Sequence, residues 1–280
     1  MIAYNQSHPT QEPFTHYIYQ YTSSIGSLDT LSEKFVARAF PTFYTQLYFE
    51  FYGGISKLQT ENSTTHITKR TYVKSGIDAW FDIYDIASRK TDIPVKNFKV
   101  DLFPHTLYEV FGLSPKEILN VDLSVEDIWG NKESASVMLE RLEGTTSHEE
   151  MITIFESYFL HEVKTRNINS NQYTPQFLEY HNSLQEFSKK LGYSTRWVQS
   201  NYRDILGVGF KELQSNMRFL KTLKSIDALV QTQDSINFSL LALECDYYDQ
   251  AHFIKEFKRF SGMTPAMYLK TYYNNTHFYW

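Results

Sequence analysis

Two short stretches of this 280-residue chain space their arginine, lysine and glutamine side chains so that they can hydrogen-bond to the edges of DNA bases. The first stretch carries polar side chains three and four residues apart, which places them on one face of a helix: Arg196, Gln199, Ser200 and Arg203. Arginine donates two parallel hydrogen bonds to guanine and glutamine pairs similarly with adenine, each pair being worth roughly 1–3 kcal/mol of discrimination. We therefore interpret Arg196 and Gln199 as base readers and expect this face to lie in the major groove.

The second stretch has the same character, and its outer face is formed by Gln250, Ala251, Ile254, Lys255 and Lys258. Gln250 is predicted to read a base, whereas the two lysines contact bases or phosphates. The apolar side chains of Ala251 and Ile254 are suited to contact thymine methyl groups.

Three further side chains are assigned to the edges of these faces. Arg203 is expected to contact bases or phosphates, and Arg259 to meet a phosphate or an acidic neighbour. Trp197 has two interpretations, a cover over a sugar-phosphate edge or packing against the next helix, and we favour packing.

Each face requires a helix to hold it. The second face is predicted to belong to a helix over 250–260, whose inward stripe recurs at i, i+4 and i+7: Phe253, Phe257 and Phe260. Asp249 can cap the start of this helix by accepting hydrogen bonds from free backbone N–H groups, and Gly262 and Pro265 end it. Together with the preceding short helix and tight turn, this pattern predicts a helix-turn-helix unit.

The ordered string over 242–269 closely resembles the DNA-binding signature of AraC/XylS-type bacterial transcription regulators. The matching positions are Asp246, Tyr247, Asp249, Phe253, Phe257, Lys258, Gly262, Thr264 and Pro265. The family usually has Gly at the position of Asp246, and Asp tolerates a left-handed backbone better than most residues do. Such regulators carry two of these units joined by a long helix, so the resemblance implies a second unit upstream.

The upstream unit is found over 183–210, where Ser194 can cap a helix near 195–206 with an inward stripe of Val198, Tyr202 and Ile205. The resemblance is looser here, because serine stands at position 200 where the family usually has a second arginine. We expect this unit to bind DNA more weakly or to read different bases. Residues 211–226 place apolar side chains at helical spacing without a proline, which predicts the connecting helix.

A rigid tandem pair of recognition helices can match two half-sites about one helical turn, roughly 34–36 Å, apart. A single chain is therefore expected to occupy two successive major grooves. Charge agrees with this division: residues after 170 contain 12 Lys and Arg against 10 Asp and Glu, whereas residues 1–170 contain 15 against 22. A net charge of +2 is modest for a DNA-binding region, so we expect attraction from local placement and no DNA contact from the acidic half.

Composition favours globular domains, with 42% hydrophobic residues. The sequence does not start with a basic stretch followed by an apolar one, as a signal peptide would. No apolar run approaches the roughly 18 residues needed to cross a bilayer. We therefore expect a cytoplasmic protein without membrane contact. The single cysteine, Cys245, is predicted to be a buried thiol.

The first part of the chain predicts an α+β domain over 1–165. Strands are expected over 42–52, 71–84 and 95–103, the first with Phe43, Leu47, Phe49 and Phe51 on one face and Tyr44, Tyr48 and Tyr52 on the other. Helices are expected over 106–112, 125–142 and 147–164, the last with a capping box formed by Ser147 and Glu150. A polar linker over 166–176 and an all-α domain over 177–280, with two helix-turn-helix units joined by a long helix, complete the predicted organisation.

The resemblance implies that the first domain senses an effector or dimerises. Double-stranded DNA is the principal expected partner, with RNA polymerase, a small-molecule effector of the first domain and a second copy of the chain as further ones. The residues identify no effector-binding position. A DNA-binding adaptor without an effector, which acts through protein contacts, stays open as an alternative.

An enzyme is the rival class. The nine histidines show no HExxH spacing, and CxxC, GxSxG and P-loop motifs are missing from the sequence. A metal site joining His105 with His161 and Glu162 is supported by residue type alone. We therefore expect no catalytic residue, no cofactor and no metal.

Overall fold

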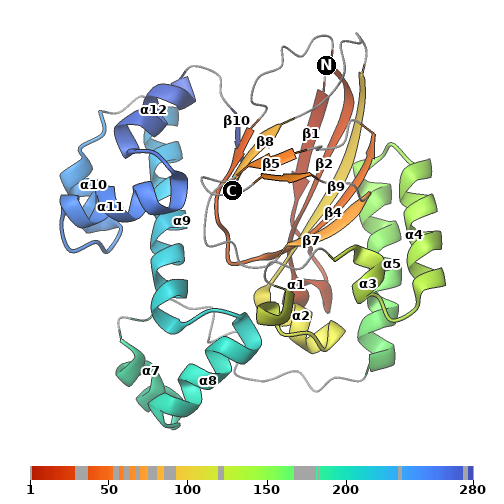
Figure 1. The fold of residues 1–280 in the computed structure, drawn as a ribbon, viewed down its shortest axis with the longest axis horizontal. Helices are drawn as coiled ribbons and strands as arrows, with labels where there is room; N and C mark the ends of the chain where they lie inside the picture. Colours follow the sequence, from red (N-terminus) through yellow and green to blue (C-terminus); the bar gives the residue numbers. More distant parts are fainter. Residues whose placement is uncertain are drawn as a thin grey trace.

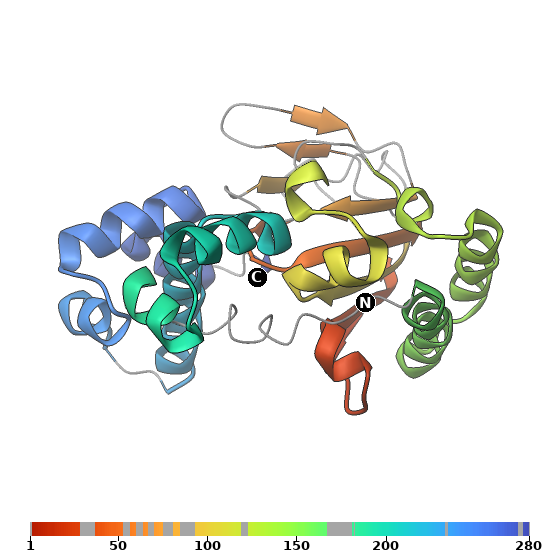
Figure 2. The same ribbon diagram turned by 90° about the horizontal axis from the view of Figure 1, so that it is seen from below.

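The first part of the chain folds around two β-sheets, and the last part is mostly helical (Figure 1). The computed structural model describes residues 2–28, 37–52, 57–59, 64–66, 70–74, 81–84, 93–118, 123–166, 181, 183–232, 235–273 and 277–279. The helices within residues 125–166 lie on one side of the sheets and the helical C-terminal region lies on the other, as both views show (Figures 1 and 2). The expected order, an α+β domain followed by helices, is confirmed.

The first sheet is antiparallel and has the order β1-β2-β9-β4-β7. Its strands are β1 (Ile2–Ser7), β2 (Ile18–Leu28), β9 (Ile93–Leu102), β4 (Thr45–Tyr52) and β7 (Thr71–Lys74). Alternation sends Leu47, Phe49 and Phe51 of β4 into the core, as predicted. Phe43 departs from that face because β4 starts only at Thr45, and its ring packs against the helical C-terminal region instead.

The second sheet has the order β10-β3-β8-β5-β6. Its strands are β10 (His277–Tyr279), β3 (Ala37–Ala39), β8 (Phe81–Tyr84), β5 (Lys57–Gln59) and β6 (Thr64–His66). The prediction of one strand over 71–84 was wrong, because β7 and β8 belong to different sheets and residues 75–80 lie outside the described residues. β10 pairs in parallel with β3, so the end of the chain is hydrogen-bonded to the N-terminal domain.

The helices of the N-terminal domain are α1 (Phe14–Tyr17), α2 (Pro104–Phe111), the 3-10 helix η1 (Pro115–Ile118), α3 (Val125–Ile128), α4 (Lys132–Gly144) and α5 (His148–Arg166). The single helix predicted over 125–142 is therefore two. The chain breaks because the N–H of Gly130 donates to Glu162 and the Asn131 side chain caps α4 by accepting from the N–H of Ser134.

Only half of the predicted capping box of α5 forms. The hydroxyl of Ser147 accepts from the N–H of Glu150 at 3.3 Å, as expected. The carboxylate of Glu150 accepts a hydrogen bond from the hydroxyl of Thr145 instead of reaching back to the backbone of Ser147.

The two faces of the first sheet differ in chemistry. One face packs its apolar residues against α5 through Phe155 and Phe159, which are fully buried. The opposite face buries polar side chains around Asp101, whose carboxylate accepts from Gln20 at 2.6 Å and from Gln46 at 3.0 Å. Strand register brings these groups together, because Asp101 of β9 is paired with Gln20 of β2 and with Gln46 of β4.

The first residue of the predicted linker, Arg166, is the last residue of α5, where its guanidinium donates to the carbonyls of Phe111 and Ile128. The rest of that linker, over 167–176, lies outside the described residues. Among the described helices, none is both long and apolar enough to cross a membrane.

In the described residues of the C-terminal region there are six helices: α7 (Leu184–Leu191), α8 (Thr195–Leu206), α9 (Phe210–Thr232), α10 (Phe238–Glu244), α11 (Gln250–Ser261) and α12 (Pro265–Tyr273). α9 is the predicted connecting helix, longer than expected at 23 residues. It carries α7 and α8 near one end and α10 to α12 near the other (Figure 1).

The N-terminal domain reaches into this helical region through the segment between β3 and β4. Phe40 is 1% exposed and its ring packs against the rings of Phe219 in α9 and Tyr268 in α12. The side-chain amide of Asn216 donates to the carbonyl of Pro41 at 3.5 Å. Phe40 thus belongs to the core of the C-terminal region although it lies in the N-terminal part of the sequence.

Candidate nucleic-acid interface

The first helix-turn-helix consists of α7 and α8, and local signals define both ends of each helix. The hydroxyls of Ser183 and Ser194 accept from backbone N–H groups three residues on, at 3.1 and 3.2 Å. Gly192, with φ of 75°, supplies the left-handed turn between the helices. The predicted stripe of Val198, Tyr202 and Ile205 is buried, which directs the polar side of α8 outward.

The outer face of α8 is exposed at Arg196, Gln199, Ser200 and Arg203. Within the described part of the chain, the side chains of Arg196, Gln199 and Arg203 make no hydrogen bond or ion pair, so DNA can engage them without displacing a protein partner. Ser200 instead donates to Asp204 at 3.1 Å. Trp197 is half-buried and stacks on Tyr193 of the turn before α8, with ring centroids 4.0 Å apart.

The second helix-turn-helix consists of α10 and α11. Asp249 caps α11 by accepting from the N–H of His252 at 2.7 Å, and Gly262 ends it with φ of 73°. The rings of Phe253, Phe257 and Phe260 are buried, as the stripe predicted.

The outer face of α11 exposes Gln250, Ala251, Lys255 and Lys258. Gln250 accepts a hydrogen bond from the hydroxyl of Ser239 at 2.8 Å, so its amide is already engaged by α10. Ile254 is only half-exposed because it packs against the helical core. The guanidinium of Arg259 lies over the ring of Phe260, 4.9 Å from its centroid.

The turn of the second unit contains a contact that sequence reasoning missed. Asp246 has φ of 62°, the left-handed conformation anticipated for the position where the family usually has Gly. Its carboxylate forms an ion pair with Lys221 of α9 at 2.7 Å, so a surface charge pair ties the turn to the connecting helix. The opposite charges were visible in the sequence, but their pairing across 25 residues was not.

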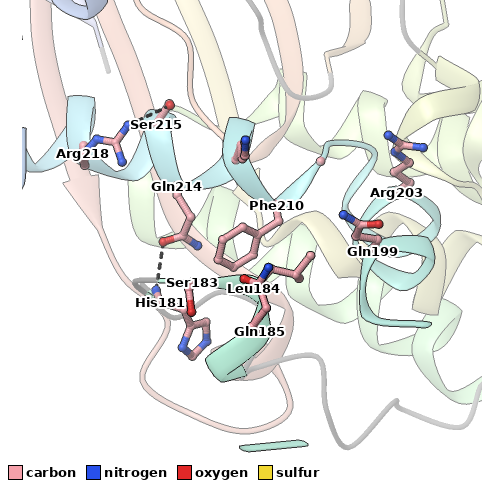
Figure 3. A pocket seen from close by; sticks show the side chains of 12 residues that line it. His181, Ser183, Leu184, Gln185, Gln199, Arg203, Phe210, Gln214, Ser215 and Arg218 are labelled. Carbon is pink, nitrogen blue, oxygen red and sulfur yellow. Dashed lines mark hydrogen bonds between the residues drawn. The ribbon is translucent and has the colours of Figure 1, made fainter. Parts of the chain in front are cut away.

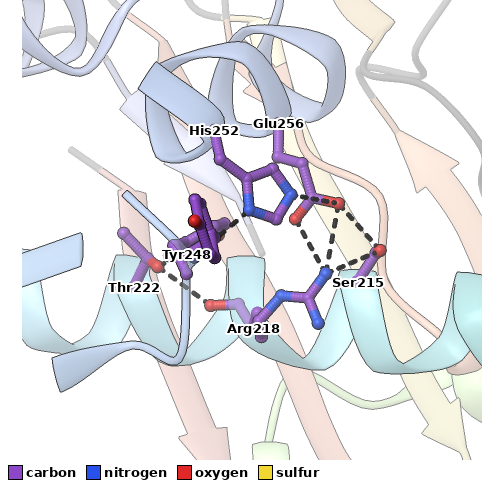
Figure 4. Close-up of polar contacts among 7 residues, drawn as sticks. Ser215, Arg218, Thr222, Tyr248, His252 and Glu256 are labelled. Atoms are coloured by element: carbon purple, nitrogen blue, oxygen red, sulfur yellow. Dashed lines mark hydrogen bonds and ion pairs between the residues drawn. The ribbon is translucent and has the colours of Figure 1, made fainter. Parts of the chain in front are cut away.

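A second polar contact, also missed, fixes α11 on α9 (Figure 4). Arg218 of α9 donates to both carboxylate oxygens of Glu256, at 3.2 and 3.1 Å, and the hydroxyl of Ser215 donates to the same carboxylate at 2.9 Å. His252, one turn before Glu256, approaches it at 3.6 Å. A largely buried carboxylate with several hydrogen-bond partners is held in one position more firmly than an exposed ion pair is.

A cleft of about 620 Å³ opens beside α8, between the start of α7 and the start of α9 (Figure 3). Gln199 and Arg203 of α8 line one wall, and Lys211 and Gln214 of α9 line the other. The amide oxygen of Gln214 accepts from the N–H of His181 at 2.9 Å. The cleft therefore presents cationic groups next to the outer face of α8.

The C-terminal end of α8 rests on the N-terminal domain. α8 packs against α2 and η1, and Gly207 ends α8 with φ of 74°. A Cβ atom on Gly207 would lie 2.7 Å from Cβ of Pro115 in η1, so only glycine fits this approach. Both outer faces remain exposed in this arrangement.

The residues of the metal site considered from the sequence are not brought together. His161 is exposed on α5, whereas the carboxylate of Glu162 accepts from the N–H of Gly130 at 3.1 Å and pairs with Arg166 at 3.2 Å. Cys245 is buried, as expected, with its thiol 3.8 Å from the hydroxyl of Ser225.

Comparison with known protein families agrees with the C-terminal assignment. Residues 187–271 match the family model described as a helix-turn-helix domain. No curated protein matches the chain. Two structures of ToxT, one from Vibrio cholerae and one from Vibrio cholerae O395, are similar to this chain, each at 14% identity with a TM-score of 0.44. Each match covers 89% of this chain, and the two cover 98% and 97% of the respective ToxT chains. A third, of ToxT bound to an unsaturated fatty acid, has 14% identity and a TM-score of 0.42, and covers 89% of this chain and 94% of that one.

Proposed function

We propose that this chain is a DNA-binding transcription regulator of the AraC type, because residues 187–271 match a helix-turn-helix domain. We further propose that it reads two successive major grooves with α8 and α11. The observation that carries the proposal is that each helix buries an aromatic or aliphatic stripe and exposes a polar face. Both helices are anchored to α9, which supplies the rigid spacing that tandem readout requires.

In α8, we assign Arg196 and Gln199 to base edges, because they are exposed and have no side-chain partner among the described residues. Arg203 lines the cleft beside Lys211, so we assign it to a phosphate at the edge of the groove. Ser200 is occupied with Asp204 and adds a weaker contact than the usual arginine would. This substitution is the reason to expect weaker binding by the first unit.

In α11, we assign Lys255 and Lys258 to bases or phosphates and Ala251 to a thymine methyl group, since all three are exposed. To read adenine, the side-chain oxygen of Gln250 must turn away from Ser239 or accept a second hydrogen bond from the base. Ile254 contributes a methyl contact with its exposed part, and Arg259 contacts phosphate from the flank.

We further propose that residues 1–165 form the responsive domain, 166–176 the linker and 177–280 the DNA-binding domain. The first domain contacts the DNA-binding domain at two places: α2 packs against α8, and Phe40 packs beside α9. Through these contacts the first domain can alter the spacing of the two helix-turn-helix units. We propose a small molecule as the effector of this first domain. A second copy of the chain and RNA polymerase are the proposed protein partners, and no enzymatic reaction is proposed.

The test compares binding of the full-length protein to the DNA upstream of its own gene and to random DNA across a salt series. We expect selective binding that weakens steeply with salt, because phosphate contacts release counterions. Binding that does not distinguish the two DNAs would contradict base readout. Selective binding that stays insensitive to every small molecule tried, together with capture of RNA polymerase, would favour the adaptor alternative.

A further inference from the structure

One edge of the N-terminal domain brings together three metal-ligating side chains that DNA binding does not use. His16 lies in α1, and His105 and Glu109 lie one turn apart in α2. One ligand atom from each residue lies within 4.8 Å of the others. His105 and Glu109 are buried, and His16 is half-buried.

The hydrogen bonding of His105 suits a metal ligand. Its Nε2 lies 3.0 Å from the backbone carbonyl of His16, and because a carbonyl only accepts, this nitrogen carries the proton. Nδ1 then keeps its lone pair, and this atom is buried without a hydrogen-bond partner in the described part of the chain. Metal-binding histidines characteristically donate their second ring N–H to a carbonyl or carboxylate, which fixes the tautomer.

The other two side chains are already at a suitable separation. Nε2 of His16 lies 3.3 Å from Oε2 of Glu109. Ligand atoms that bind zinc at 2.0–2.1 Å in a tetrahedron are about 3.4 Å apart, so this distance needs little change. The Glu109 side chain is 1% exposed, and a carboxylate in such a buried position is stabilised by a cation beside it.

We propose that His16, His105 and Glu109 form a binding site for a divalent first-row transition metal ion, with Zn²⁺ as the best fit. Two imidazoles and one carboxylate are ligands that zinc accepts, and three protein ligands leave a fourth position for water or an added ligand. The ion would join α1 to α2. Since α2 packs against α8, the site lies one helix away from the proposed DNA-reading surface.

The ordinary alternative is an ion pair between a protonated His16 and Glu109, with His105 as a neutral core histidine. That arrangement explains the 3.3 Å contact but leaves Nδ1 of His105 buried without a partner. A buried polar atom without a partner is unfavourable, and a bound metal ion supplies that partner.

The test titrates chelator-treated, full-length protein with Co²⁺, whose visible absorption reports its coordination, and then displaces the Co²⁺ with Zn²⁺. Metal binding is measured without DNA, so its outcome does not depend on the proposed function. We expect one ion per chain and a higher melting temperature with Zn²⁺. His16→Gln and Glu109→Gln should each weaken binding by about tenfold or more.

His161→Gln is the matched control, because His161 is exposed on α5 and should leave metal affinity unchanged. Melting curves without metal show whether each variant is folded, and either of the two ligand variants suffices for the comparison. Failure to bind one ion per chain, or equal affinity in the wild-type protein and in the folded ligand variants, would overturn the assignment.

Discussion

The ring of Phe40 packs edge-to-face against the ring of Phe219, with centroids 5.8 Å apart, although Phe40 lies between β3 and β4 and Phe219 lies in the connecting helix. Phe40 therefore fills a position in the core that supports the second helix-turn-helix unit. The N-terminal domain contributes to the structure of the DNA-binding region as well as contacting its surface.

Replacing this ring by a methyl group tests that relationship. Phe40→Ala should lower the free energy of unfolding by about 3–5 kcal/mol, because a fully buried phenylalanine leaves a cavity. Urea unfolding followed by helical circular dichroism measures the change. Tyr52→Ala is the control, since Tyr52 is an aromatic residue of β4 that is 44% exposed. Equal, small effects of the two variants would show that Phe40 does not stabilise the helical region.

The contact between α8 and η1 is tested by a pair of glycines. Gly192 and Gly207 both have φ near 75°, but only Gly207 has a close neighbour, Cβ of Pro115. Gly192→Ala should cost about 1–2 kcal/mol for the left-handed backbone alone. Gly207→Ala should cost about 1–3 kcal/mol more, because the added Cβ must displace η1.

Thermal or urea unfolding of the two full-length variants gives the comparison. If both lose the same stability, α8 does not rest on the N-terminal domain in solution.

Asp227 on α9 predicts a pH dependence of stability. Burial raises the pKa of Asp227 to about 6, above the ordinary value of 3.8. The folded state therefore binds more protons than the unfolded state between these values, so stability falls as the pH rises through this window and the cost is complete above about 6. The full shift corresponds to about 3 kcal/mol, which we reduce to about 1 kcal/mol because the carboxyl is only half-buried.

Asp227→Asn should thus stabilise the protein by about 1 kcal/mol at pH 7.5, with a gain that shrinks toward pH 4. Urea unfolding at several pH values measures the difference from wild type. Glu244→Gln, an exposed acid on α10, is the control and should show no such trend. A gain that is independent of pH would contradict the titration of Asp227.

Lys258 separates affinity from specificity. Lys258→Ala should weaken binding to specific and random DNA alike and should reduce the salt dependence by about one phosphate contact. Lys224→Ala removes an exposed lysine of α9, which belongs to neither recognition helix, and should change neither quantity. Loss of binding to the specific site alone would reassign Lys258 to a base.

The recognition helices were predictable from the sequence because their signals are local. Stripes at i, i+4 and i+7, a capping side chain and a terminal glycine all act within one helix, and the buried phenylalanines of α11 lie where this pattern placed them. The outward orientation of Arg196 and Lys258 follows from the same geometry.

Contacts between distant segments were not predictable in this way. Phe40 looked like a residue of the N-terminal domain, and Lys221 and Asp246 looked like unrelated surface charges. His16 and His105 are 89 residues apart, so no local spacing indicated that they meet. Short strands such as β3 and β10 were missed because three residues carry too little alternation to recognise.

Footprinting of the full-length protein on its selected DNA site tests the central claim most directly, with Arg196→Ala and Gln250→Ala as the two variants. The account predicts two protected segments about one helical turn apart, with Arg196→Ala weakening protection in one segment and Gln250→Ala in the other. Each variant should lower specific affinity by about 1–3 kcal/mol. A single protected segment, or loss of the same contacts in both variants, would contradict readout of two successive grooves.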